Sequence, residues 1–181
     1  LPHASRMSIL SVNAGSSSLK FALYPINSGA IGEAEVTGNI EGLEPFGHPR
    51  ISFCATGQAK ESADVAVQPA QDVFDAALNT LKALLASRFA HLRVQAIAHR
   101  VVHGGAFYSN SVRVTPEVMT QLATLNALAP LHQPHNLAGI SAFAESFPDV
   151  PQVACFDTAF HRTLSPLETT FAIDKQLTAQ G

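Results

Sequence analysis

The sequence predicts an α/β domain in which helices flank a mixed β-sheet, and three observations predict it. Apolar and β-branched residues alternate in four segments before any helix, near residues 8–14, 18–25, 31–37 and 50–55. From about residue 70 the apolar spacing becomes helical, and two further apolar runs then alternate with helical segments. Strands first, followed by alternating helices and strands, are typical of a sheet that combines hairpins with parallel crossovers.

The first two strands enclose a turn that is suited to binding phosphate. Ile9 to Val12 runs into Gly15-Ser16-Ser17-Ser18, and the next strand leaves the turn with Lys20 at its base. Such a turn presents backbone N–H groups and three hydroxyls beside an ammonium, which suits phosphate oxygens. The Asn13 amide is a candidate for holding a metal-bound water or a phosphate oxygen. The turn is not a Walker A loop, and a Ser-rich hairpin without any ligand is the alternative interpretation.

The later elements are predicted by their spacing and their caps. An apolar stripe from Val73 to Leu85 predicts an amphipathic helix over roughly 70–88. The nearly continuous apolar run 94–102 predicts a central strand that is buried on both faces. Thr115 and Pro116 are the expected start of a second helix, and Asn136 is expected to cap a third that ends near Phe147. A last buried strand is predicted at 152–156.

Composition excludes several classes of protein. The chain has 181 residues, 46% of them hydrophobic and 14% charged, with a net charge of -3, which indicates an ordinary globular domain. Its 11 Lys and Arg residues form no basic run, so a nucleic-acid interface is not expected. No apolar run approaches membrane-spanning length. Cys54 and Cys155 lie in apolar runs, which predicts reduced, buried thiols and a cytoplasmic location. We expect residues 1–6 to be an N-terminal extension or remnant and 7–181 to form the domain.

Three polar groups follow or interrupt apolar segments. Arg100 lies in the apolar run 94–102, where a guanidinium needs a partner or a cavity. Its planar fork suits a carboxylate substrate, and a structural ion pair with Asp157 is the alternative. His132, in a loop rich in Pro and His, is a candidate to stabilise an oxyanion or to satisfy a loop carbonyl. Asp157 is a candidate metal or catalytic group, or the cap of a turn. Asn13, Arg100 and Asp157 each lie near a predicted strand end, where sites of such sheets gather.

Four segments together resemble the N-terminal half of the acetate and propionate kinase family. They are Asn13-Ala-Gly-Ser-Ser-Ser-Leu-Lys20, His99-Arg-Val-Val-His-Gly-Gly105, Ala129-Pro-Leu-His132 with Asn136, and Phe156-Asp-Thr-Ala-Phe-His161. They occur in the family's order with similar spacing, over roughly residues 7–181. The resemblance implies the actin, sugar-kinase and Hsp70-like (ribonuclease H-like) fold, with the active site between two related domains. The second, C-terminal domain is absent from this sequence.

The resemblance also implies roles for individual residues. Asn13 would lie near Mg²⁺ and the phosphates, and Lys20 with Gly15, Ser16, Ser17 and Ser18 would contact the ATP phosphates. Arg100 would bind the carboxylate substrate and the phosphoryl group. Val102 and Leu131 would line the pocket for the substrate's methyl group, and His132 would lie beside the transferring phosphoryl group. Asp157 would be the catalytic acidic residue. Because acetate is already ionised at neutral pH, we expect Asp157 to orient Mg²⁺-bound water or Arg100 rather than to accept a proton.

The implied reaction is reversible phosphoryl transfer from ATP to acetate, which gives acetyl phosphate and ADP with Mg²⁺ (or Mn²⁺) as the cofactor. This chain would supply one half of the site and would be inactive alone, and the full-length enzyme would be a homodimer. Propionate kinase is the alternative within the same class. A non-catalytic fragment that binds a carboxylate or a partner chain is the alternative from another class. An Hsp70-like ATPase is disfavoured, because the segment around Arg100 would have no role there.

Overall fold

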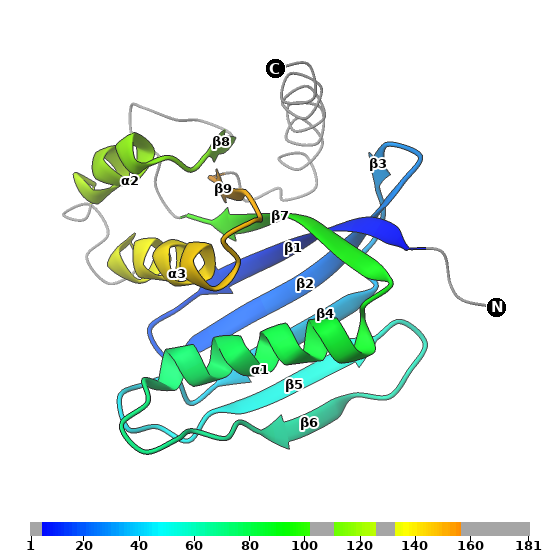
Figure 1. The fold of residues 1–181 in the computed structure, drawn as a ribbon, viewed down its shortest axis with the longest axis horizontal. Helices are drawn as coiled ribbons and strands as arrows, with labels where there is room; N and C mark the ends of the chain where they lie inside the picture. Colours follow the sequence, from blue (N-terminus) through cyan, green and yellow to red (C-terminus); the bar gives the residue numbers. More distant parts are fainter. Residues whose placement is uncertain (1–4, 102–110, 126–132, 157–181) are drawn as a thin grey trace.

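A single curved β-sheet forms the framework of the domain (Figure 1). The structure is a computed structural model that describes residues 5–101, 111–125 and 133–156. Its strands run in the order β6-β5-β4-β2-β1-β7-β9-β8, and the short strand β3 pairs with β2 outside this path. The mixed sheet flanked by helices is the α/β architecture that the sequence predicts.

The first half of the sheet is antiparallel throughout. It consists of β1 (Arg6–Ala14), β2 (Ser18–Asn27), β3 (Ala30–Ile31), β4 (Val36–Glu41), β5 (Arg50–Ala55) and β6 (Glu61–Asp64). The prediction of one strand over 31–37 is wrong. The chain forms the short strand β3, leaves the sheet, and re-enters it as β4. Within β4, Gly38 leaves room for the Phe21 ring opposite it, since a Cβ at Gly38 would lie 2.1 Å from the ring. The strand β6 was not predicted.

The second half of the sheet is built on parallel crossovers. Strand β7 (Leu92–Arg100) pairs in parallel with β1 on one side and with β9 (Gln152–Cys155) on the other. This confirms the central strand that the apolar run predicts, although β7 begins two residues earlier than that run and ends at Arg100. An additional short strand, β8 (Ser111–Arg113), pairs antiparallel with β9 at the edge. Parallel pairing brings the carboxyl ends of β1, β7 and β9 to the same edge of the sheet.

Of the three helices in the described ranges, α2 begins at the cap that the sequence indicates and α1 begins close to its predicted start. Helix α1 (Val73–Arg88) is capped by Asp72, which accepts a hydrogen bond from the Asp75 N–H at 3.1 Å, so it starts three residues later than predicted. Helix α2 (Pro116–Ala123) has the predicted cap, since Thr115 Oγ1 accepts from the Val118 N–H at 3.2 Å. Helix α3 (Gln133–Ser146) begins before Asn136, so the prediction that Asn136 caps this helix is wrong.

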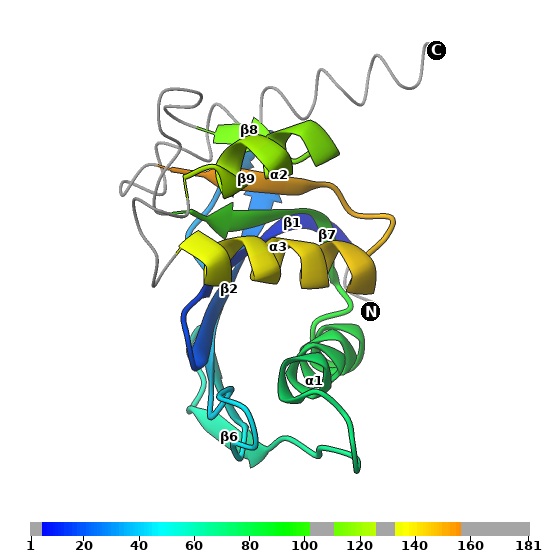
Figure 2. The same cartoon turned by 90° about the vertical axis from the view of Figure 1, so that its left-hand side faces the viewer.

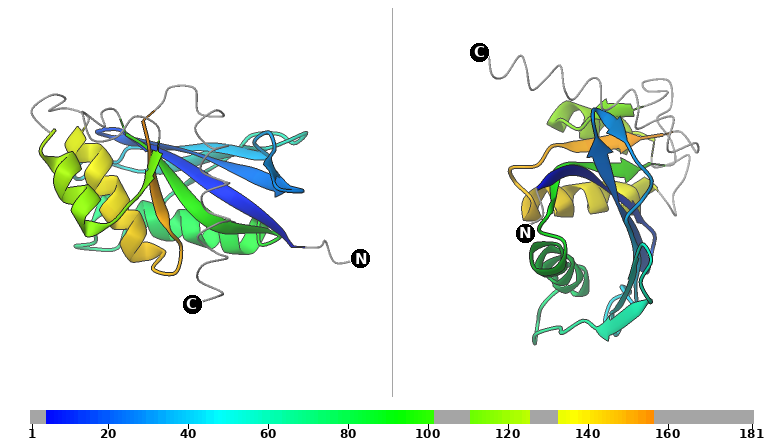
Figure 3. Two further views of the ribbon diagram at one scale, coloured as in Figure 1. Left: turned by 90° about the horizontal axis from the view of Figure 1, so that it is seen from above. Right: turned by 90° about the vertical axis from the view of Figure 1, so that its right-hand side faces the viewer.

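The helices in the described part all pack on one face of the sheet, and α1 lies within its concave side (Figures 2 and 3). Inward residues of the strands alternate along the chain and meet the apolar faces of α1 and α3, as at Leu10, Leu19, Leu81 and Phe143. A second cluster joins α2 and α3 to β9 through Leu122, Ile140 and Ala154. None of the helices in the described ranges is long and apolar enough to cross a membrane.

Candidate functional site

The hairpin between β1 and β2 has a fixed backbone and an exposed tip. The Gly15 N–H donates to the Ser18 carbonyl at 2.8 Å, which closes the turn. The Ser17 carbonyl accepts from the Leu43 N–H at 2.9 Å, so the turn is also tied to the connection after β4. Gly15, Ser16 and Ser17 are exposed, and none of the Ser16, Ser17 and Ser18 hydroxyls bonds to another described residue. These hydroxyls therefore remain available to a ligand.

Three of the predicted site residues surround one pocket beside this hairpin. Asn13 and Lys20 lie directly opposite each other on β1 and β2. The parallel register sets Val12 opposite His99, which places Arg100 next to Asn13 at the end of β7. The pocket, of about 220 Å³, is here called the Arg100 pocket; its lining consists of Ser11, Val12, Asn13, Lys20, Phe21, Ala22, Tyr24 and Arg100. Residues that are 80 positions apart in the chain thus meet on the sheet face that the described helices leave uncovered.

The Arg100 pocket is positively charged. Its described lining residues include one ammonium and one guanidinium and no carboxylate. Between described residues there are three ion pairs, Arg6–Glu35, Arg50–Asp64 and Arg88–Glu61, and neither Lys20 nor Arg100 takes part in them. The alternative ion pair of Arg100 with Asp157 lies outside the described residues. Two cations on one pocket wall favour an anionic ligand.

A buried polar pair supports Arg100 from the other face of the sheet. The His99 Nε2–H donates to Gln152 Oε1 at 2.5 Å, because the Gln152 Nε2 already donates to the Val150 carbonyl at 3.1 Å. The His99 ring also meets the Phe143 ring edge to face, with 5.4 Å between centroids. Burial lowers the pKa of His99 to about 4, although the Gln152 hydrogen bond opposes this shift. His99 is therefore neutral near pH 7 and joins β7 to β9 directly behind the pocket.

A second pocket shares Lys20 with the first. This Lys60 pocket of about 320 Å³ has a lining of Lys20, Thr37, Gly38, Asn39, Ser52, Phe53, Cys54 and Lys60. Its polar side chains come from facing positions on three strands, because Asn39 lies opposite both Lys20 and Ser52. The Asn39 Nδ2 donates to Glu41 at 2.9 Å, and its buried Oδ1 has no described partner. Apart from Lys20, the sequence analysis did not predict these residues, although polar residues at every second position of 37–41 and 52–54 were the available signal.

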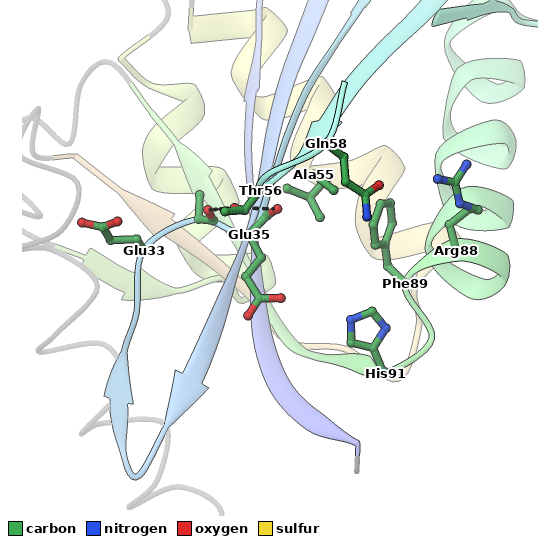
Figure 4. A pocket seen from close by; sticks show the side chains of 10 residues that line it. Glu33, Glu35, Ala55, Thr56, Gln58, Arg88, Phe89 and His91 are labelled. Atoms are coloured by element: carbon green, nitrogen blue, oxygen red, sulfur yellow. Dashed lines mark hydrogen bonds between the residues drawn. The ribbon is translucent and has the colours of Figure 1, made fainter. Parts of the chain in front are cut away.

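A larger pocket lies at the opposite end of the sheet, and none of the predicted site residues is among its described lining residues. This Glu35 pocket measures about 540 Å³, and Figure 4 shows Glu35, Gln58, Phe89 and His91 around it. Its charges are largely compensated, since Glu35 pairs with Arg6 at 2.6 Å and Arg88 pairs with Glu61 at 2.8 Å. The Thr56 hydroxyl is also engaged by the Ala34 and Glu35 carbonyls. Size alone therefore does not identify the site.

The remaining predicted residues are only partly accounted for. Val102, Leu131, His132 and Asp157 lie outside the described residues. Both cysteines are free, but only Cys155 is buried as predicted, whereas Cys54 is half-buried. Burial raises the pKa of the Cys155 thiol to about 12, so it is inert at neutral pH. Within the described ranges, no group of three His, Cys, Asp or Glu side chains is placed to hold a metal ion.

Comparison with known proteins decides the family. The model of the acetokinase family matches residues 8–181. This chain belongs to the acetokinase family. It is 41% identical over 173 residues to an acetate kinase of Rhodopseudomonas palustris, covering 96% of this chain and 43% of that protein. It is 43% identical over 177 residues to an acetate kinase of Methylocella silvestris, with 96% and 44% covered.

Solved structures give the same family. The domain superposes on a propionate kinase from Francisella tularensis with a TM-score of 0.72 and 35% identity, covering 87% of this chain and 38% of that one. It superposes on the acetate kinase of Porphyromonas gingivalis with a TM-score of 0.69 and 32% identity, with the same coverage. The chain thus spans less than half the length of the relatives that it matches, and its match is consistent with an N-terminal portion.

Proposed function

We propose that the protein to which this chain belongs transfers a phosphoryl group reversibly from ATP to acetate, and that this chain supplies the N-terminal half of the site. The observation that carries the proposal is the Arg100 pocket, in which Asn13, Lys20 and Arg100 meet beside the exposed hairpin. Membership of the acetokinase family supports the same reaction. The required chemistry is the approach of one anion to another, and two cations that form no ion pair with a described residue provide for it.

Different residues of the site are proposed to bind the two substrates. Acetate is ionised at neutral pH, so it is a ready nucleophile and needs no general base. The Arg100 fork suits the acceptor carboxylate and the transferring phosphoryl group, whose negative charges it offsets. Lys20 and the hairpin from Gly15 to Ser18 hold the ATP phosphates through an ammonium, backbone N–H groups and hydroxyls. Catalysis then rests on positioning and charge stabilisation.

Magnesium is part of the proposal, and its fit to this chain is specific. Mg²⁺ usually keeps several waters and is held by substrate phosphates with one or two protein oxygens. The exposed Asn13 amide at the pocket offers such an oxygen, directly or through a metal-bound water, and the described residues contribute no larger ligand cluster. When bound, the ion neutralises phosphate charge. Asp157 has the role of orienting metal-bound water or Arg100, and His132 of contacting the phosphoryl group.

Acetate and propionate are both candidate acceptors. A solved relative named as a propionate kinase superposes well on this domain, which favours propionate as the second candidate. The side chains of Val102 and Leu131 are proposed to surround the methyl end of the acid. One methylene more or less in an apolar pocket changes discrimination by only ~1–3 kcal/mol, so both acids are expected to react. A cytoplasmic homodimer of the full-length protein completes the proposal.

A hydroxylamine trap for acyl phosphate tests the function. The assay contains ATP, Mg²⁺ and either acid, and it compares this chain with the full-length protein. Acyl hydroxamate formed only by the full-length protein would support the proposal, and the ratio of the two acids would define the acceptor. Activity of this chain alone would contradict the division of the site into halves. Absence of hydroxamate in both, with carboxylate binding retained, would instead favour a non-catalytic binding role.

A further inference from the structure

Among the described residues, the carbonyl of Ala14, at the root of the hairpin, has no partner on a neighbouring strand. The Gly15 N–H donates to Ser18, so Gly15 and Ser18 form a hydrogen-bonded antiparallel pair. The adjacent pair, Ala14 and Leu19, is then of the non-hydrogen-bonded type, and the Ala14 carbonyl points away from β2. On that side lies β7, but the β1–β7 pairing ends with Val12 opposite His99, before Ala14 is reached.

Asn136 on α3 satisfies this carbonyl. Its Nδ2 donates to the Ala14 oxygen at 3.0 Å across 122 residues of sequence, and Asn136 is only 4% exposed. A buried polar group without a partner is costly, so this bond between the buried Asn136 amide and the carbonyl of the half-buried Ala14 favours the observed position of the hairpin. The residue that was expected to cap the helix is thus used for a long-range contact with the hairpin.

The same helix also approaches Ala14 closely at Gly139, which has no side chain. A Cβ added at Gly139 would lie 3.1 Å from the Ala14 Cβ, which is tighter than an ordinary contact. Helix α3 itself is well anchored elsewhere, because Ile140 and Phe143 are buried and Lys82 donates to the Ser146 carbonyl at 2.8 Å. The helix is therefore the fixed element, and its contacts with Ala14 help to set the position of the hairpin.

In the described part of the chain, a pocket lies beside the hairpin on the side of α3. This pocket of about 350 Å³ lies beside Gly15 and Ser16, and Asp72 and His135 are among the residues that line it. Hydrogen bonds hold the hairpin on both sides of this space, from the Leu43 N–H to the Ser17 carbonyl and from the Asn136 side chain to the Ala14 carbonyl. Loss of the Asn136 contact leaves room for the hairpin to shift.

We propose that Asn136 is a positioning residue that fixes the position of the phosphate-binding hairpin relative to Arg100. The inference rests on the proposed function, since it assigns a task to a residue that contacts neither substrate. Asn136 lies near the start of α3, so its hydrogen bond joins the first turn of this helix to the hairpin. Loss of the Asn136 hydrogen bond should displace the hairpin that is proposed to bind ATP, because α3 itself stays anchored by its buried residues.

Kinetics of the full-length protein test the assignment. Asn136→Ala should lower kcat/KM for ATP by roughly 10–100-fold, the loss expected from a displaced reacting group, with little change in KM for acetate. Gly139→Ala pushes on Ala14 from the same helix and should show a smaller effect of the same kind. Ile140→Val is the matched control, because it loosens the same helix without contacting Ala14. Equal kinetics in Asn136→Ala and Ile140→Val would overturn the proposal.

A pH profile separates positioning from stability. Asn136→Asp replaces the donor by an acceptor that faces the Ala14 carbonyl, and burial raises the pKa of such a carboxyl. Protonation restores a donor, so the activity of this variant relative to the parent protein should rise as pH falls. A constant ratio between pH 8 and the acid limit of the enzyme would contradict a role for the donated hydrogen bond.

Amide hydrogen exchange on this 181-residue chain gives a readout without catalysis. Exchange at Ser16, Ser17 and Leu19 should be faster in Asn136→Ala than in Ile140→Val. If the full-length protein makes no acyl phosphate but this exchange difference is found, the proposed function fails while the structural part of the positioning assignment stands. Unchanged exchange in an active enzyme would refute the positioning role alone.

Discussion

The two faces of the sheet differ in chemistry although the same strands form both. One face carries Leu10, Val12, Leu19 and Phe21, which are buried against α1 and α3. The other carries Ser11, Asn13, Lys20 and Ala22 from the same two strands, and these line the Arg100 pocket. The alternation of side chains along a strand makes this division possible. Among the described residues, the two larger buried clusters lie on the helix-covered face, and a smaller cluster of Ile9, Ala98, Val153 and Cys155 lies on the other face, where binding is expected beside the hairpin.

The difference extends across the whole antiparallel half of the sheet. A row of polar residues crosses the uncovered face at facing positions, from Asn13 through Lys20, Asn39 and Ser52 to Ser62. The Ser52 and Ser62 hydroxyls lie 2.9 Å apart at the end of this row. Substitutions on the two faces should therefore separate cleanly, because one set acts on folding and the other on kinetics.

Replacing Arg100 should give the largest effect. Arg100→Ala in the full-length protein removes the fork that is proposed to offset the charge of both reacting groups, and turnover should fall on the order of 10³-fold. Arg100→Lys keeps the charge without the fork and should recover only part of the loss. Steady-state kinetics with varied acetate measure both variants. Near-normal kinetics of Arg100→Ala would remove this residue from the site.

On the covered face, Phe143→Ala should destabilise the domain strongly. The ring is fully buried between the His99 ring and the Phe147 ring, and truncation of such a residue costs ~3–5 kcal/mol. Urea denaturation of this chain measures the change in the free energy of unfolding. Phe46→Ala is the control, because Phe46 is 97% exposed and its removal should have little effect. Similar losses in both variants would argue against the helix-covered face as the main source of stability.

The His99 pair predicts a specific acid sensitivity. In the folded state burial holds the pKa of His99 at about 4, compared with 6.5 for an ordinary histidine. The unfolded chain therefore binds the proton more readily, and stability is lost as pH falls from 6.5 toward 4, on the order of 3 kcal/mol. His99→Gln cannot titrate, so its stability difference from the parent chain should shrink over this window. A difference that stays constant with pH would contradict a neutral buried His99.

Replacing Lys20 or Lys60 should give the smallest effects, and the two lysines form a matched pair for comparison. Both line the Lys60 pocket, but only Lys20 also lines the Arg100 pocket. A charged hydrogen bond contributes ~1.5–3 kcal/mol, so Lys20→Ala should raise KM for ATP roughly 10–100-fold. Lys60→Ala should leave it nearly unchanged. Equal effects would extend the phosphate site into the second pocket, and no effect of Lys20→Ala would remove the hairpin lysine from it.

Sequence patterns predicted the framework of the fold better than its edges. The parallel strands and α2 were predictable because their apolar runs and caps are local signals. Strand β6 was not, because all four of its residues are exposed and carry no apolar alternation. The boundaries of β4 were missed because Gly38 interrupts its pattern, where the Phe21 ring occupies the space of a side chain.

The residues of the site could be predicted from sequence motifs, but the contacts that position them could not. Asn13, Lys20 and Arg100 stood out by residue type and by their place near strand ends, and the structure brings them to one pocket. The Asn136–Ala14 hydrogen bond joins residues that are 122 positions apart. Local rules assigned that asparagine to a helix cap instead, because an N-cap signal is readable from neighbours whereas an unpaired carbonyl across the fold is not.

The central claim is that substrates bind to the uncovered face beside the β1–β2 hairpin. Its most direct test is a titration of ¹⁵N-labelled chain with Mg²⁺·ATP and then with acetate, followed by amide chemical shifts. The account predicts that the largest changes occur at Asn13, Gly15 to Lys20 and Arg100, with Lys20→Ala reducing them. Changes centred instead on Thr56, Gln58 and His91 at the larger Glu35 pocket, with an unaffected hairpin, would contradict it.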